Sequence, residues 1–177
     1  MLEAKNGEEL LRICEAENIP LSEYAIRIEM EKAEITREEA YSRMRNVLEV
    51  MKDGANEGRA KEVHSVSGLI GGDGYKMQKY LENNETLTGD VIVKAMAMAL
   101  SSSEVNASMG RIVACPTAGS CGILPAVVLS AGERLKRSDD ELIKALFTSS
   151  AVILYCHLHG WAQSPWFAHL LARYLLK

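Results

Sequence analysis

The segment "TGDVIVKAMAMALSSSEVNASMG", from Thr88 to Gly110, decides the fold of this chain. Apolar residues occupy most sides of its helical projection, which predicts a long, largely buried helix with an N-terminal cap near Thr88. No strong alternation of apolar and polar residues, the mark of half-buried strands, appears elsewhere in the sequence. The chain is therefore expected to be all-α, a helical domain with glycine-rich loops between its helices.

Further helices are predicted on both sides of this segment, where apolar residues recur at helical spacing. Their approximate limits are residues 6–18, 20–33, 36–58, 122–136 and 138–147. Pro20 marks a helix entry, and Thr36–Glu39 and Ser138–Glu141 have the spacing of capping boxes. Gly54 and Gly58 are expected to soften the end of the third helix.

Composition and charge exclude some classes of function for this chain. The chain has 177 residues, of which 47% are hydrophobic and 25% charged, and its net charge is −4. These values suit one globular domain, and the lack of a basic cluster argues against nucleic-acid binding. The charged N-terminus has no apolar core of a secretory signal, so the four cysteines are interpreted as thiols or metal ligands.

The downstream loop, residues 115–122 ("CPTAGSCG"), is built from small residues and directly precedes a predicted helix. Small residues let backbone amides approach a ligand, and the helix N-terminus favours an anion such as a carboxylate or phosphate. Thr117 and Ser120 add hydroxyl donors. A tight helix–helix connection explains the same composition, and the pattern alone does not separate the two interpretations.

Known catalytic motifs do not fit this loop. A phosphate-binding Walker loop and a nucleophile elbow both need residues that are missing here, and no second cysteine pair completes a zinc site. A nucleophilic Cys121, with its pKa lowered by the helix N-terminus, is a further hypothesis, although no histidine is placed to assist it. The segment "YCHLHG", residues 155–160, lacks a nameable fourth ligand, and a structural role is favoured.

The upstream loop, residues 64–76 ("HSVSGLIGGDGYK"), contains four glycines, one acid and one base besides its histidine. It is interpreted either as a flexible turn or as the second wall of a polar site. In the second case Asp73 and Lys76 orient a ligand, and His64 is available for acid–base chemistry.

Residues 86–135, with "NASMGRIVA" and "PTAGSCG", resemble the alpha chain of bacterial iron–sulfur L-serine dehydratase, also called L-serine ammonia-lyase. The run "SGLIGGDGYKMQKYL" is similar to that family's "SGLTGGD…K" segment, and the resemblance covers roughly residues 1–150. It implies an all-α lyase that converts L-serine to pyruvate and ammonia. It also implies a cytoplasmic enzyme of amino-acid degradation and gluconeogenesis that works with a beta chain and binds neither nucleic acid nor membrane.

The resemblance further implies a 4Fe–4S cluster, held by three cysteines, whose open iron acts as a Lewis acid on the serine hydroxyl. In this picture the two loops bind the substrate. The implied substrate-binding residues are Thr117, Gly119, Ser120 and Gly122 in the downstream loop and Ser67, Gly71, Gly72, Asp73 and Lys76 in the upstream loop. The base that removes the α-proton is not identified.

The sequence departs from the family where the cluster ligands are expected. The family's "GCQ" and "CDP…PC" motifs do not occur, so no metal ligand is assigned in this chain. After about Ala151 the resemblance stops. We therefore expect a C-terminally truncated alpha chain that is inactive alone. Residues 1–150 are expected to be the N-terminal part of the helical domain, and residues 151–177 a divergent, frame-shifted or otherwise foreign tail that packs poorly.

Two alternatives to an active enzyme follow. The first is a non-catalytic helical fragment that keeps a carboxylate-binding loop and contacts to a partner chain. The second is membrane association through residues 145–172, which contain no Asp, Glu, Lys or Arg, although their histidines, Gln163 and Pro165 make a poor span.

Overall fold

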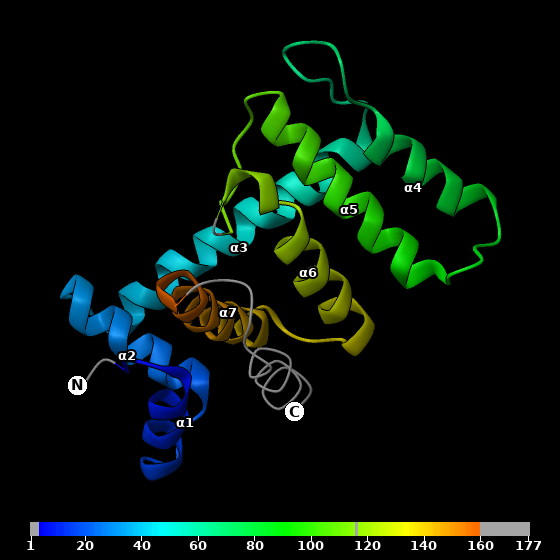
Figure 1. Ribbon diagram of the computed structural model, residues 1–177. Helices are drawn as coiled ribbons and strands as arrows, with labels where there is room; N and C mark the ends of the chain where they lie inside the picture. Colours follow the sequence, from blue (N-terminus) through cyan, green and yellow to red (C-terminus); the bar gives the residue numbers. More distant parts are fainter. Residues whose placement is uncertain (1–3, 116, 160–177) are drawn as a thin grey trace. The chain divides into compact units, whose positions relative to one another are not determined.

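The computed structural model describes residues 4–115 and 117–159 (Figure 1). In chain order its elements are α1 (Gly7–Ala16), α2 (Leu21–Ala33), α3 (Arg37–Ala60), α4 (Asp73–Asn83), α5 (Asp90–Ala107), the 3-10 turn η1 (Ala118–Ser120), α6 (Ile123–Leu135) and α7 (Asp139–His159). Within these residues there is no strand, only an isolated bridge between His64 and Gly71. The all-α prediction is confirmed. None of the described helices is long and apolar enough to cross a membrane.

The described residues divide into two compact units. The first unit contains α1, α2, the N-terminal part of α3 and α7 from Ile143 onward. The second unit contains residues 46–142, which include the rest of α3, both glycine-rich loops, α4, α5 and α6. Every predicted substrate-binding residue therefore belongs to the second unit.

The first unit is built around an apolar cluster contributed by α1, α2 and α7. Its buried members are Leu10, Cys14, Leu21, Tyr24, Ile28 and Val152. Poor packing was expected after Ala151; Val152, the next residue, is 6% exposed and belongs to this cluster. The packing of the rest of the tail stays a prediction. Trp161 and Trp166, on which the prediction also rests, lie outside the described residues.

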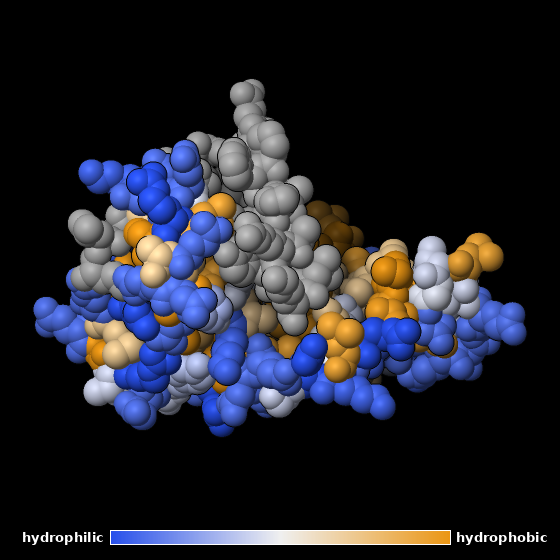
Figure 2. All heavy atoms as spheres, turned by 90° about the horizontal axis from the view of Figure 1, so that it is seen from below, coloured by the Kyte–Doolittle hydropathy of each residue, from blue (hydrophilic) through white to orange (hydrophobic). Residues whose placement is uncertain are grey.

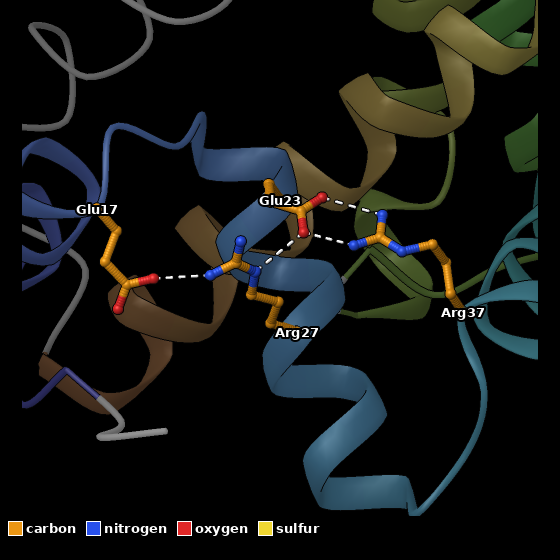
Figure 3. A network of polar contacts seen from close by, with 4 residues as sticks. All are labelled: Glu17, Glu23, Arg27 and Arg37. Carbon is orange, nitrogen blue, oxygen red and sulfur yellow. Dashed lines mark hydrogen bonds and ion pairs between the residues drawn. The ribbon is translucent and has the colours of Figure 1, made fainter.

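A polar network joins α2 to the start of α3 within this unit (Figure 3). The carboxylate of Glu23 accepts hydrogen bonds from Arg27 Nε at 2.9 Å and from Arg37 Nη1 at 3.0 Å, and it also pairs with Arg37 Nη2. Arg27 reaches the Glu17 carboxylate at 2.7 Å. The hydrogen bonds from Arg37, together with Arg27, hold the pKa of Glu23 below its ordinary value.

Glycines in the second half of α3 allow α5 to approach closely. Gly54 and Gly58 were expected to soften the end of this helix; α3 includes both and ends at Ala60, two residues after Gly58. A Cβ on Gly58 would lie 2.9 Å from Ser101 Cα, which shows how near the two backbones are. Ser101 Oγ accepts from Gly58 N–H and donates to the Gly54 carbonyl. The packing of α3 on α5 therefore explains these glycines.

The central helix α5 is buried on one face only. Its buried residues are Val93, Ala97, Met98, Ser101, Ser102, Glu104 and Val105. Six large apolar side chains of α5 and α6 are at least 41% exposed, namely Val91, Ile92, Met96, Ile123, Val127 and Leu135. Figure 2 shows apolar side chains standing among hydrophilic ones at the surface. The expectation of a largely buried helix is thus correct for the face of α5 that carries the buried residues, while Val91, Ile92 and Met96 are exposed.

The predicted helix starts agree with the structure where local hydrogen bonds define them. Ser138–Glu141 forms a reciprocal capping box, with Ser138 N–H donating to Glu141 at 2.8 Å and Glu141 N–H to Ser138 Oγ at 3.4 Å. Thr36 accepts from Glu39 N–H at 3.2 Å. Pro20 is the N-cap residue of α2. The N-cap of α5 is Gly89, beside the predicted Thr88, and no side chain caps it.

Candidate functional site

The upstream loop folds back on itself before α4 begins. Gly72 N–H donates to the Val63 carbonyl at 3.0 Å and Ser65 N–H to the Ile70 carbonyl at 2.9 Å, which closes a narrow hairpin-like turn. Gly71 has a φ of +147°, and a Cβ there would lie 2.4 Å from the Val63 oxygen. Only glycine fits this position. Gly71 therefore shapes the loop that carries the other predicted residues.

Three further predicted residues of the upstream segment occupy accessible positions. Ser67, at the exposed tip, contacts Ser65 Oγ with its own Oγ at 3.1 Å. Asp73 and Lys76 belong to the first turn of α4, and Lys76 Nζ lies 3.3 Å from Asp73 Oδ1. Because both side chains are more than half exposed, this ion pair costs little to open for a ligand. His64 lies 3.3 Å from the Glu62 carboxylate and is also accessible.

The downstream loop is closed by its own hydroxyl groups. Ser120 Oγ donates to the Cys115 carbonyl at 2.7 Å and lies 3.0 Å from Thr117 Oγ1. Thr117 N–H donates to Ser120 Oγ at 3.3 Å, so the pair forms a capping box around η1. Their hydroxyls thus hold the loop shape in this structure.

The two predicted glycines of the downstream loop occupy opposite environments. Gly119 is exposed, and the nearest atom to an added Cβ is Thr117 Oγ1 at 3.9 Å. Gly122 is buried against α5, where an added Cβ would lie 2.5 Å from the Ala99 oxygen. Gly119 leaves space for a ligand, while Gly122 allows α6 to pack on α5. The packing interpretation is therefore correct at Gly122, and ligand approach at Gly119 stays a prediction.

Both loops are attached to the C-terminal turn of α5 (Figure 1). Val66 N–H of the upstream loop donates to the Ala107 carbonyl at 3.1 Å. Asn106 Nδ2 donates to the Ala118 carbonyl of the downstream loop at 3.2 Å. Neighbouring residues of one helical turn thus hold the two predicted walls at the same end of α5.

Glu104, a residue outside the set predicted from the sequence, lies in the same turn and is 4% exposed. Its Oε1 accepts from Asp73 N–H at 2.6 Å and from Gly74 N–H at 3.2 Å. Two signals pointed to this turn: Glu104 is the single charged residue between positions 95 and 110, and Asn106 follows it in the "NASMGRIVA" motif.

The cysteines beside the downstream loop are buried thiols. Burial raises the pKa of Cys115 to about 11 and also raises the pKa of Cys121. The hypothesis of a Cys121 nucleophile with a lowered pKa is therefore wrong, because loss of solvation outweighs the favourable helix end. Cys121 is 2% exposed, so its sulfur is also inaccessible to a substrate.

The described residues do not fit an iron–sulfur cluster. Such a cluster needs several thiolates arranged around one site. The cysteines with described side chains are Cys14 in the first unit and Cys115 and Cys121 in the second. Among the side chains described, no group of three or more His, Cys, Asp or Glu is suited to holding a metal ion. Cys156 and the histidines of "YCHLHG" fall outside this set of side chains.

The chain whose two loops share one helix end belongs to the serine dehydratase alpha chain family. A profile of the family, described as "Serine dehydratase alpha chain", matches residues 16–164 and so runs past residue 150. No solved structure is significantly similar to the chain.

Curated relatives carry the same family name. The "Probable L-serine dehydratase, alpha chain" of Bacillus subtilis (strain 168) is 37% identical over 83% of this chain and 49% of its own length. The "L-serine dehydratase, alpha chain" of Peptoniphilus asaccharolyticus is 33% identical over 82% of this chain and 50% of its own. "L-serine dehydratase 2" of Escherichia coli (strain K12) is 28% identical over 83% of this chain and 33% of its own. The chain thus spans about half the length of the alpha chains it matches.

Proposed function

We propose that this chain provides the substrate-binding part of an L-serine dehydratase, which converts L-serine to pyruvate and ammonia in the cytoplasm. The observation that carries the proposal is the attachment of both glycine-rich loops to Asn106 and Ala107, adjacent residues of one helical turn. The family membership and the names of the relatives support the choice of substrate.

L-serine carries a carboxylate, an ammonium group and a hydroxyl, and the loops offer a complement for the two charges. The first bond of α6 runs from Ala126 N–H to the Gly122 carbonyl, so the amides of Ile123 and Leu124 have no partner within the helix. These amides and the nearby hydroxyls of the downstream loop suit a carboxylate. In the upstream segment Asp73 suits the ammonium group, and Lys76 provides a second cation for the carboxylate.

The dehydration chemistry requires groups beyond those described. We infer that the ligands of a cluster come from outside the set Cys14, Cys115 and Cys121, an inference supported by the burial of these thiols. The relatives' designation as alpha chains supports a beta chain as the partner that completes the enzyme. A second candidate is a non-catalytic helical fragment that retains the carboxylate-binding loop and its partner contacts. The burial and raised pKa values of Cys115 and Cys121 favour this candidate.

Titration of the purified chain with L-serine, followed by amide chemical shifts, tests the binding proposal. We expect saturable shifts in the loops and a dissociation constant that rises about tenfold or more in Lys76→Ala, because a charge-assisted hydrogen bond is lost. Lys79→Ala is the matched control, since Lys79 is an exposed lysine one turn further along α4 that pairs with Glu82. Absence of any saturable shift at millimolar L-serine contradicts the proposal.

Pyruvate formation separates the enzyme from the fragment. After anaerobic reconstitution with iron and sulfide, the chain alone is expected to stay colourless and to form no pyruvate. A brown, active protein would show that this chain holds the cluster by itself. Activity that appears only on addition of a beta chain would support the two-chain enzyme over the fragment.

A further inference from the structure

A buried carboxylate from α5 occupies the N-terminus of α4. The first amides of any α-helix lack partners within the helix and need acceptors from elsewhere. The N-cap residue of α4 is Gly72, which has a φ of +77° and no side chain to offer. Glu104 Oε1 takes the amides of Asp73 and Gly74 instead, at 2.6 and 3.2 Å. A negative charge is also favoured there by the helix dipole.

The second oxygen of the same carboxylate is enclosed by backbone. Added Cβ atoms on Gly58 of α3 and on Gly74 of α4 would each lie 3.2 Å from Glu104 Oε2. This oxygen is buried and has no hydrogen-bond partner. A carboxylate so enclosed does not reach a substrate, so any effect on ligand binding passes through the groups it holds.

We propose that Glu104 is the positioning residue of the upstream wall, a cap supplied by α5 that fixes the first turn of α4. Asp73 is held through its own amide, and Lys76 follows within the same turn, where its N–H donates to the Gly72 carbonyl at 3.0 Å. Glu104 therefore sets the place of the Asp73–Lys76 pair relative to the end of α5 that holds the downstream loop. The consequence for L-serine rests on the proposed function, whereas the capping role does not.

Amide hydrogen exchange measured by NMR on the full chain tests the cap directly. In Glu104→Ala the Asp73 and Gly74 amides should exchange roughly ten- to a hundredfold faster, since both lose a charged acceptor. In Glu104→Gln the acceptor oxygen stays but the charge is lost, and an increase of about three- to tenfold is expected. Ser101→Ala is the matched control, a buried polar residue one turn earlier whose hydroxyl bonds Gly58 and Gly54; its backbone lies against Gly74 but is unchanged by the substitution.

The outcomes separate the two proposals. Wild-type exchange rates at Asp73 and Gly74 in both Glu104 variants overturn the cap, as does an equal increase in Ser101→Ala. If Glu104→Ala does not fold, Glu104→Gln decides alone, and unchanged rates in it overturn the cap. L-serine affinity should fall about tenfold in Glu104→Ala, partly recover in Glu104→Gln and stay unchanged in Ser101→Ala. Faster exchange in the Glu104 variants of a chain that binds no L-serine would support the cap and reject the proposed function.

Discussion

Substitution of alanine at two glycines of α3 should change stability in opposite directions. Gly54 and Gly58 are both buried, lie one turn apart and face α5. A Cβ at Gly54 would have Ser102 Oγ as its nearest neighbour at 3.8 Å, an ordinary van der Waals contact. A Cβ at Gly58 would lie 2.9 Å from both Cα and Oγ of Ser101, one of which is backbone. The pair therefore isolates helix propensity from steric overlap.

The magnitudes follow from these contacts. Gly54→Ala should stabilise the chain by about 0.5–1 kcal/mol, because alanine is the better helix former and loses less entropy on folding. Gly58→Ala gains the same term but overpacks the interface, which costs about 1–3 kcal/mol. It also strains the 2.8 Å hydrogen bond from Gly58 N–H to Ser101 Oγ, which contributes about 1 kcal/mol. The net expectation for Gly58→Ala is a loss of about 1–3 kcal/mol.

Urea denaturation followed by circular dichroism measures both changes, and thermal melts should shift by about 2–4 °C per kcal/mol for a chain of this size. The double variant Gly58→Ala with Ser101→Gly is the control, since removal of the serine side chain removes the 2.9 Å contact with Oγ and leaves the one with Cα. Equal stabilities for Gly54→Ala and Gly58→Ala would refute the close approach of α3 and α5. A more stable Gly58→Ala would refute it as well.

Three further outcomes are expected. Glu23→Gln should destabilise the chain by about 0.5–1 kcal/mol at pH 7. Because the folded-state pKa of Glu23 is lowered, the difference from wild type should begin to shrink near the ordinary value of 4.5 and vanish only as the pH falls through the lower folded-state pKa. A pH-independent difference in urea melts would contradict this. Iodoacetamide should alkylate Cys115 very slowly at pH 8 in the folded chain, since the pKa of its thiol is about 11, and mass spectrometry of labelling with and without urea checks it. Gly122→Ala should lower the free energy of unfolding by about 1–3 kcal/mol, because its Cβ would overlap the Ala99 oxygen. Gly119→Ala should leave the urea midpoint unchanged. Equal midpoints for the two variants would refute a packing role for Gly122.

Features fixed by near neighbours were predictable from the sequence. The capping box of Ser138 and Glu141 involves residues three apart, so both hydrogen-bonding partners are visible within one short sequence motif. The entry of α2 at Pro20 and the limits of α6 are determined in the same local way. The all-α class follows because such local signals agree along the described helices.

Features that depend on distant partners were not predictable. Gly58 was interpreted as a weak helix end, because the sequence does not show that Ser101 lies against it. The pKa of Cys121 is raised, whereas the hypothesis from the sequence was a lowered pKa. The difference arises because the burial of Cys121 depends on how α5 and α6 pack. Glu104 went unnoticed for the same reason: its partners, the amides of Asp73 and Gly74, are about thirty positions away.

The substrate-binding residues were predicted from short family motifs, and the structure shows that the two loops carrying them lie at the same end of α5. The residues of the downstream loop and those around Asp73 share a helix end that no spacing rule connects. The roles of these residues in binding remain the prediction that the L-serine titration tests.

The attachment of both loops to one turn of α5 has a mechanical consequence. The Ala107 carbonyl holds the upstream loop and the Asn106 side-chain Nδ2 holds the downstream loop, so a displacement of this turn reaches both loops through adjacent residues. Tight packing transmits such a displacement instead of absorbing it. On the proposed function, a ligand that orders one loop lowers the entropy cost of ordering the other, and the L-serine titration should show the two loops responding together.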